Sequence, residues 1–521
     1  MKLSKLGIGK GEYLAPILEI AVATIAAFIN VIFATISDIW KKDNVGRRTF
    51  WIYLGFGIYF FGTILVTISA IYPCMYFFKE QPSDEFLSFF NLSFGIYFVG
   101  YTFSEMGRML MCLMINTYFL DYFEEEKQDD VNLVKTFTTG FGYILGYGAY
   151  IINALIVFDY NNSNTTSSYS SNSIGYEDSN TYDIINHTIV QIKQSGSILT
   201  FVIHIATIIC MIIGVIFFHK ASHSLGFAKN VDTQKQSEEV KEERNPIIKF
   251  FKALKDGHLM INHEVFCSYL TVFFGWMIWG SLVDNFHDMN REYIFPGKEN
   301  VDIRFLLHGI DFTSVGIVMI IVSLILLIII KKMKKNKNTI LGYFTVFSFV
   351  VFMFLSIFFI FIVYSPQTQG EKTLNALSLS IPFIGVSFVM VAMESYPYSF
   401  LKHQTDEHYH GFLMSILHLF IHGGQFTVFL INIINKKAQP TSTPNNTNVW
   451  NSYSIILPLT FIASIVSLMF LKIKESIVDN PGSQEMVTDY PIENNESIGS
   501  METVNQTDLS SNDIDYSNID I

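Results

Sequence analysis

The sequence predicts an all-α membrane protein, on the evidence of its apolar composition, its long uncharged runs and the placement of its basic residues. Half of the 521 residues are hydrophobic, and 49 residues are phenylalanine. The runs 316–330 and 340–364 contain no charged residue. Apolar segments of about 20 residues cross a hydrocarbon core about 30 Å thick as helices. Because backbone groups find no water there, only helices or closed barrels are stable, and these runs are too long and too uniformly apolar for barrel strands.

The apolar runs divide the chain into eleven predicted spans. Polar or charged segments separate them, and the longest of these segments is 219–262. The predicted spans are, approximately, 13–37, 50–73, 90–118, 132–158, 196–218, 264–285, 307–330, 340–364, 376–400, 411–433 and 452–472.

Basic residues predict which ends of these spans face the cytoplasm. Lysine and arginine concentrate in the loops 41–48, 219–262 and 331–337. With strict alternation of the spans, all three loops fall on the same side of the membrane. Cytoplasmic loops carry the excess of lysine and arginine, so this side is predicted to be cytoplasmic.

Four glycosylation sequons provide an independent check on this orientation. Each lies in a segment that the alternation places outside, and glycosylation acceptors occupy loops on that side. The predicted acceptors are Asn161, Asn164, Asn186 and Asn445. These sites also favour the secretory route, ending at the plasma membrane or at an endosomal or vacuolar membrane.

The same alternation puts the start of the first span, with the basic segment 1–10, on the outside, against the charge rule. We therefore expect one further span before residue 12 that this chain lacks. Counting it, the prediction is twelve spans in two six-helix bundles. The predicted domains are an N-terminal bundle (1–218), a cytoplasmic central loop (219–262), a C-terminal bundle (263–475) and an acidic cytoplasmic tail (476–521).

The net charge of −12 arises mainly from that tail, which holds ten acidic residues and no lysine or arginine. Its composition, rich in asparagine and serine, predicts disorder. The membrane part is thus nearly neutral and shows no sign of nucleic-acid binding. The four cysteines lie far apart, without metal-binding or redox spacing. We find no nucleophile–base spacing, phosphate loop or metal cluster, and expect neither an enzyme nor a cofactor.

The segment from Ser37 to Arg48 (SDIWKKDNVGRR) resembles the major facilitator signature between that family's second and third spans. An acidic residue, Asp38, precedes a basic stretch that ends in Gly46, Arg47 and Arg48. The glycine permits a tight reversal, and the arginines can pair with carboxylates across a moving interface. The resemblance implies a gate rather than a substrate site. A plain cytoplasmic anchor is the alternative interpretation.

Further motifs resemble the sucrose/proton symporter branch of the glycoside–pentoside–hexuronide:cation symporters. They occupy residues 142–147 (GYILGY), 288–293 (DMNREY), 396–398 (YPY) and 411–425. The resemblance implies proton-coupled uptake of a disaccharide-like sugar by alternating access. Taken alone, Gly142 and Gly146 favour helix packing, because small residues line helix contacts in membranes.

Two ionisable residues inside the span 90–118 form the predicted proton-coupling pair. Glu105 and Arg108 are three residues apart, so they share a helix face and can pair. Ionisable groups are costly in hydrocarbon and therefore usually functional. In the family an acid stands at the position of Glu105, whereas its substrate-linked arginine corresponds to Asn116. Protonation of Glu105 would break the pair and bias the equilibrium between conformations. A structural ion pair is the alternative.

Further polar residues are candidates for gating, proton binding or substrate binding. Asp121 matches the acid that closes this span in the family, which implies a gating or capping role. Glu394 stands where the family has an aromatic or similar residue; it is a second candidate proton site, and an interfacial carboxylate is the alternative. Asp284 and Asn285, near two tryptophans, can hydrogen-bond a polyol. The predicted substrate-binding residues are Asn116, Asp284, Asn285, His418 and Gln425.

The expected partners are a small solute, protons and the lipid bilayer. Two alternatives remain open at this point. The first is a transporter of a non-sugar solute, because the family arginine is replaced by Asn116. The second is a non-transporting sensor or a defective paralogue that lacks its first helix.

Overall fold

The computed structural model describes the chain in ten segments that are almost entirely helical. They are residues 11–39, 47–76, 84–168, 205–220, 246–289, 301–332, 337–363, 368–404, 409–438 and 458–467. All of them belong to one compact unit, Met1–Lys474. The acidic tail lies outside the described residues.

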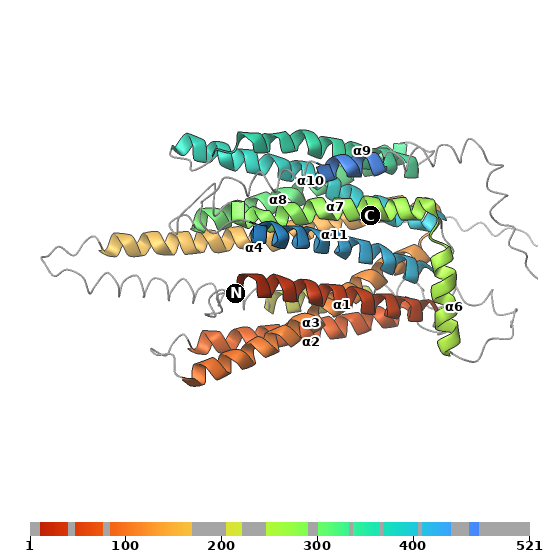
Figure 1. Ribbon diagram of the computed structural model, residues 1–521, viewed down its shortest axis with the longest axis horizontal. Helices are drawn as coiled ribbons and strands as arrows, with labels where there is room; N and C mark the ends of the chain where they lie inside the picture. The colour runs from red at the N-terminus through yellow and green to blue at the C-terminus, as the bar shows by residue number, and fades with distance from the viewer. Residues whose placement is uncertain are drawn as a thin grey trace, which may run out of the picture. The chain divides into compact units, whose positions relative to one another are not determined.

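Each of the eleven predicted spans overlaps a helix in the described part of the chain, and the helical architecture confirms the all-α membrane prediction. The helices are α1 (Gly11–Ile39), α2 (Arg47–Tyr76), α3 (Asp84–Tyr122), α4 (Glu125–Ser168), Ile205–Lys220, α7 (His263–Met289), α8 (Val301–Lys332), α9 (Lys337–Ser356) with the 3₁₀ turn η4 (Ile357–Phe361), α10 (Gln369–Gln404), α11 (His410–Ala438) and Pro458–Ser467. Among the described residues, seven helices are long and apolar enough to cross a membrane. The long helices run alongside one another (Figure 1).

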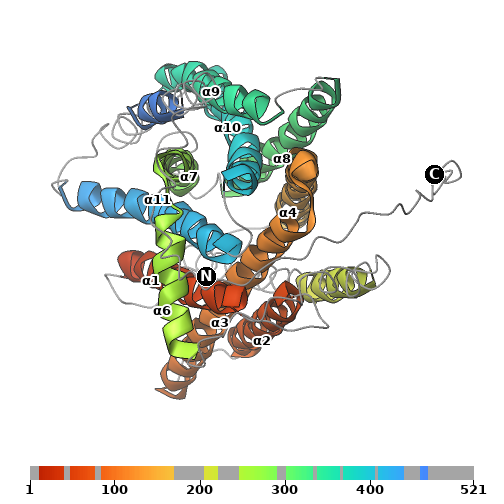
Figure 2. The ribbon, with the colours of Figure 1, turned by 90° about the vertical axis from the view of Figure 1, so that its right-hand side faces the viewer.

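A further helix, α6 (Pro246–Leu259), lies within the predicted central loop. It crosses the ends of the long helices and packs against α1 and α11 (Figures 1 and 2). Gly257 of α6 meets the ring of Phe412 so closely that an added Cβ would lie 2.6 Å from it. The loop therefore contacts the same end of the bundle as the start of α11.

Glycines bring two pairs of helices into close contact. In the α2–α3 pair, a Cβ added to Gly62 would lie 2.1 Å from the backbone nitrogen of Ser104, and one added to Gly107 would lie 2.2 Å from that of Tyr59. In the α4–α8 pair, Gly140 and Gly316 each approach the other's carbonyl oxygen. Without side chains in the way, the backbones approach closely, as is common for helices in lipid.

The packing interpretation of Gly142 and Gly146 is wrong. Both are exposed, and no atom of the described residues lies within 4 Å of an added Cβ on either. They share a face of α4 with Leu145, which is 76% exposed. Gly140 makes the close contact with α8 instead. Gly140 and Gly142 face nearly opposite sides of α4, because two residues correspond to a rotation of about 200° around a helix.

Several contacts join helices that are distant in the sequence. Helix α1 packs against α11, and α4 packs against α8 and α10 (Figure 2). Between α4, α7 and α8, the ring of Phe312 stacks on Tyr147 at 4.6 Å between centroids and meets Trp279 edge-on at 5.7 Å. These contacts connect helices of the predicted N-terminal bundle to helices of the predicted C-terminal bundle.

Substitution of Gly62 by alanine is expected to destabilise the protein by about 1–3 kcal/mol, because the added methyl group collides with backbone of α3 rather than with a movable side chain. Thermal unfolding of the purified protein in detergent measures the effect. The matched control is Gly57→Ala in the same helix, where an added Cβ meets nothing within 4 Å. Equal melting temperatures of the two variants would contradict the close α2–α3 contact.

Candidate functional site: two polar networks between helices

The first network begins at the N-terminus of α11. The first backbone N–H groups of a helix have no partner within it and favour a negative charge. Asp38, in the last turn of α1, supplies that charge. Its carboxylate accepts hydrogen bonds from the N–H groups of Gly411 at 3.1 Å and Phe412 at 2.8 Å. Asp38 thus caps a helix that begins more than 370 residues later in the chain.

Gly411 is required for this approach. A Cβ at this position would lie 2.6 Å from Oδ1 of Asp38, 2.8 Å from Nη1 of Arg48 and 2.9 Å from the carbonyl oxygen of Ala34. A side chain would therefore push α1 and α11 apart. This explains in physical terms why the segment 411–425 begins with glycine.

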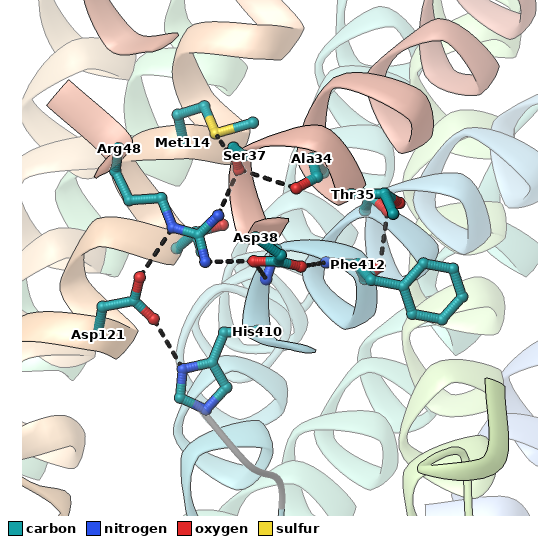
Figure 3. Close-up of polar contacts among 12 residues, drawn as sticks. Ala34, Thr35, Ser37, Asp38, Arg48, Met114, Asp121, His410 and Phe412 are labelled. Carbon is teal, nitrogen blue, oxygen red and sulfur yellow. Dashed lines mark hydrogen bonds and ion pairs between the residues drawn. The ribbon is translucent and has the colours of Figure 1, made fainter. Parts of the chain in front are cut away.

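Arg48 lies at the centre of the network, in the first turn of α2 (Figure 3). Its side chain donates hydrogen bonds to Asp38 and Ser37, and its Nε donates to Oδ2 of Asp121 at 2.8 Å. The residue is only 1% exposed. Two carboxylates compensate the burial of this cation, which also lies at the unfavourable end of its own helix dipole.

Asp121 extends the network to α3 and back to α11. Its other oxygen, Oδ1, accepts a hydrogen bond from Nδ1 of His410 at 2.9 Å, and His410 is the first residue of α11. The structure therefore brings together Asp38, Arg48 and Asp121, three of the predicted gating residues. Arg47 lies in α2, but its side chain is outside the described part, as is Gly46. His410 was not predicted as a site residue. Its neighbour Gly411 begins the motif 411–425, so the motif starts one residue after His410.

The second network lies deeper between the helices and centres on Lys135 of α4. Its Nζ is 3.3 Å from Oε2 of Glu394 on α10 and donates to Oδ1 of Asn116 on α3 at 3.3 Å. The same nitrogen lies 3.5 Å from the centroid of the Tyr398 ring, a cation–π contact. The ammonium group therefore has an ion pair, a hydrogen bond and a cation–π contact.

Two more contacts strengthen this network. Nδ2 of Asn116 lies 3.5 Å from Nε2 of His418 on α11. Nδ2 of Asn132, one turn before Lys135, donates to Oγ of Ser399 at 2.9 Å, which adds a second link between α4 and α10. Asn116 and His418, both predicted to bind substrate, thus meet each other, and four helices meet at this level.

Lys135 was not predicted as a site residue from the sequence, although the signal was present. The residue lies inside the predicted span 132–158, and a charge within a span is by itself a reason to expect a functional or paired group. Glu394 was identified only as a candidate proton site. In the structure it is the ion-pair partner of Lys135.

The predicted proton-coupling residues form an ion pair on α3. Nε of Arg108 donates to Oε2 of Glu105 at 3.0 Å, and a second bond joins Nη2 to Oε1. The Arg108 side chain is 45% exposed and that of Glu105 is 14% exposed. Both residues lie within electrostatic range of His422 on α11. Nδ1 of His422 is 3.3 Å from Oε1 of Gln425.

The side chains of the remaining predicted residues lie outside the described part of the chain. Asp284 and Asn285 lie near the end of α7, and Asn161 and Asn164 lie in the last turns of α4, but the side chains of all four are outside the described part. Asn186 and Asn445 lie outside the described residues. The glycosylation sites remain predictions.

Neither a protein-family model nor a curated protein matches the sequence. The solved structure of the major facilitator superfamily transporter FucP in its outward conformation aligns with a TM-score of 0.51. The alignment covers 87% of this chain and 89% of that one, at 12% identity. The chain has the major facilitator fold.

Two other solved structures align at lower scores. A bacterial homologue of the iron transporter ferroportin, in an outward-facing state, aligns at a TM-score of 0.48 and 9% identity over 90% of this chain and 92% of that one. The proton:xylose symporter XylE, a major facilitator protein, aligns at 0.45 and 12% identity over 87% of this chain and 85% of that one. The fold, together with the seven apolar helices found among the described residues, is that of a multi-pass integral membrane protein.

Substitution of Arg48 by glutamine is expected to cost about 3–5 kcal/mol of stability, because two buried carboxylates lose their counter-charge. Thermal unfolding in detergent measures the loss. Lys127→Gln is the matched control, since Lys127 pairs with Glu124 at the exposed surface and such pairs contribute about 0–1 kcal/mol. A small loss in the Arg48 variant, similar to the control, would refute the buried network.

The Lys135–Glu394 pair predicts a non-additive pattern. Lys135→Met and Glu394→Leu should each cost about 3–5 kcal/mol, because each leaves one charge buried alone. The double variant should recover most of that loss, since it buries neither charge. Unfolding midpoints of the parent chain, the two single variants and the double variant measure the coupling. Additive losses would show that the two side chains do not pair.

Proposed function

We propose that this protein is a secondary transporter that moves a small solute across the bilayer by alternating access. The observation that carries the proposal is that polar contacts join the two predicted bundles. Asp38 and Asp121 of the first bundle bind the N-terminus of α11, and Lys135 binds Glu394 of α10. Ion pairs and helix caps can be exchanged for water or other partners when the bundles rock about a central site.

The two bundles are the proposed segments 1–218 and 263–475, joined by the cytoplasmic loop 219–262. The first network lies at the ends of α1, α3 and α11 that the charge rule places inside the cell. In this proposal it holds the cytoplasmic side closed, and the Lys135–Glu394 network forms a second layer of the same closure. The likeness to FucP in its outward conformation supports this assignment.

The proposed solute is a disaccharide-like sugar, and the proposed coupling ion is the proton. The motif resemblance to the sucrose/proton symporters supports the sugar. The proposed coupling group is Glu105, whose protonation would release Arg108. The guanidinium group is partly exposed and within range of His422, so its release changes the polar surface that a solute meets between α3 and α11.

A second candidate is a transporter for a solute other than a sugar. Asn116 favours it, because this residue stands where the related symporters have a substrate-linked arginine. In the structure Asn116 is already bound to Lys135 and lies against His418, so its polar atoms serve the network between helices. A solute without the hydroxyl pattern of a sugar could then be selected by other residues.

Uptake of labelled sucrose, maltose and glucose into proteoliposomes tests the proposal under an imposed inward proton gradient. The parent chain should accumulate at least one sugar above its equilibrium level. Glu105→Gln should abolish accumulation driven by the gradient, because the amide cannot carry a proton. Glu124→Gln, a carboxylate change at the exposed surface, is the matched control and should leave uptake unchanged.

Three results would contradict parts of this proposal. If the Glu105→Gln variant still accumulates sugar, Glu105 is not the coupling group. The proposal that the protein is a transporter would be unaffected. Uptake of a non-sugar solute in the same assay, with none of the three sugars, would favour the second candidate. Absence of uptake of every solute tested would favour a non-transporting sensor.

A further inference from the structure

Asp311 is a buried acid that neither network uses. It lies in α8, inside the apolar segment Leu306–Lys332, and only 1% of its surface is exposed. Its helix packs against both α4 and α10. The residue therefore lies within the membrane-spanning part of the chain, on a helix that contacts both predicted bundles.

The surroundings of Asp311 differ from those of the other intramembrane acids described above. Asp38, Glu105 and Glu394 each form an ion pair with arginine or lysine. Among the described residues, no lysine, arginine or histidine forms an ion pair with Asp311. The side chain of Ser380 on α10 lies close to its carboxyl group. Its second oxygen, Oδ2, is buried without a hydrogen-bond partner in the described part of the chain.

The titratable groups packed near this position are one histidine and two tyrosines. His308 lies one turn earlier on α8, with its ring 4.5 Å from that of Phe312 and 5.7 Å from that of Tyr147 on α4. Tyr143 lies one turn before Tyr147 on α4. From α10, the nearby polar group is Ser380. In the described part of the chain, none of these forms an ion pair with the carboxyl group.

An ionised carboxylate in apolar surroundings is costly unless a counter-charge and hydrogen-bond donors compensate it. Asp311 has no counter-charge among the described residues, and its Oδ2 has no hydrogen-bond donor there. A proton on Oδ2 would remove the charge at the oxygen that has no partner. It would leave the other oxygen free to accept a hydrogen bond from the nearby hydroxyl group of Ser380. This burial therefore favours the neutral carboxylic acid over the carboxylate.

We propose that Asp311 is a proton-binding site between α8 and α10, separate from the Glu105–Arg108 pair. Oδ2 takes one proton from water and returns it to water, and no other bond changes. The further step, that this proton is exchanged during transport, rests on the proposed function.

Helix α10 has a feature that can permit such exchange. Pro382 lies inside the helix two residues after Ser380 and removes one hydrogen bond of the helical backbone. Proline positions are the usual sites of helix kinks. Ser380 can therefore move relative to α8 with a local change in α10, which would admit water to Asp311.

Infrared difference spectroscopy tests the site without any solute. The full chain, reconstituted in lipid, is titrated over the acid-to-alkaline range while the carbonyl band of protonated carboxylic acids is recorded in H₂O and D₂O. The parent should show a band component that Asp311→Asn removes and that Glu105→Gln retains. A parent spectrum with no component that depends on Asp311 would overturn the proposal.

A second variant keeps the test decisive if Asp311→Asn fails to fold. Ser380→Ala removes the hydroxyl group close to the acid and should shift the same band component to higher frequency. An unchanged component in Ser380→Ala would overturn the assignment to Asp311. A component that disappears when potassium is replaced by sodium at constant pH would overturn the proposal that Asp311 binds a proton. It would favour a metal cation as the ligand.

The transport step has its own readout. Asp311→Asn should abolish accumulation under a proton gradient and retain exchange of labelled for unlabelled solute. Retained accumulation in this variant would overturn the role of Asp311 in coupling. Absence of any uptake by the parent would count against the proposed function, and the infrared result would still decide whether Asp311 binds a proton.

Discussion

The structure depends most on one buried arginine and the two carboxylates that share it. Arg48 connects Asp38 and Asp121, so it joins the end of α1 to the end of α3 at the first turn of α2. Through the same carboxylates it positions the N-terminus of α11, which is capped by Asp38 and held at His410 by Asp121. Removing the arginine would leave both acids without their counter-charge and would weaken the attachment of α11 to the first three helices.

The helix contacts in this chain are of two kinds with different mechanical properties. In the α2–α3 pair, glycines allow the backbones to meet, and no side chain has to move for the contact to persist. Contacts between α1 and α11, and between α4 and α10, depend instead on ion pairs, helix caps and amide groups. Such contacts are directional and can be replaced by water, so they suit surfaces that separate and re-form. The α4–α8 contact, with Gly140 facing Gly316, shows that close packing also connects the predicted bundles.

Prediction from sequence was most successful where the signal is local. The spans followed from apolar runs, because a helix in lipid needs a continuous apolar segment. The major facilitator signature identified Asp38 and Arg48 as gating residues, and a separate family match gave Asp121 a gating or capping role. That all three meet at the N-terminus of α11 was not predicted. Lys135 and Asp311 were missed, even though each is an ionisable residue within a span. Gly142 and Gly146 were assigned to packing from their residue type alone, and the neighbouring Gly140 makes the contact instead.

By itself, the sequence determined the helices, their order and the end of each that carries the positive charge, because these properties depend on residues adjacent in the chain. Only the tertiary structure decided which charges meet. Arg48 and Asp121 are 73 residues apart, and Lys135 meets an acid on α10, more than 250 residues later. Such pairs depend on which helices become neighbours and on how each is rotated about its axis. A rotation of about 100° per residue turns a one-position difference into a different partner, so the hydropathy of a span leaves its ion pairs undetermined.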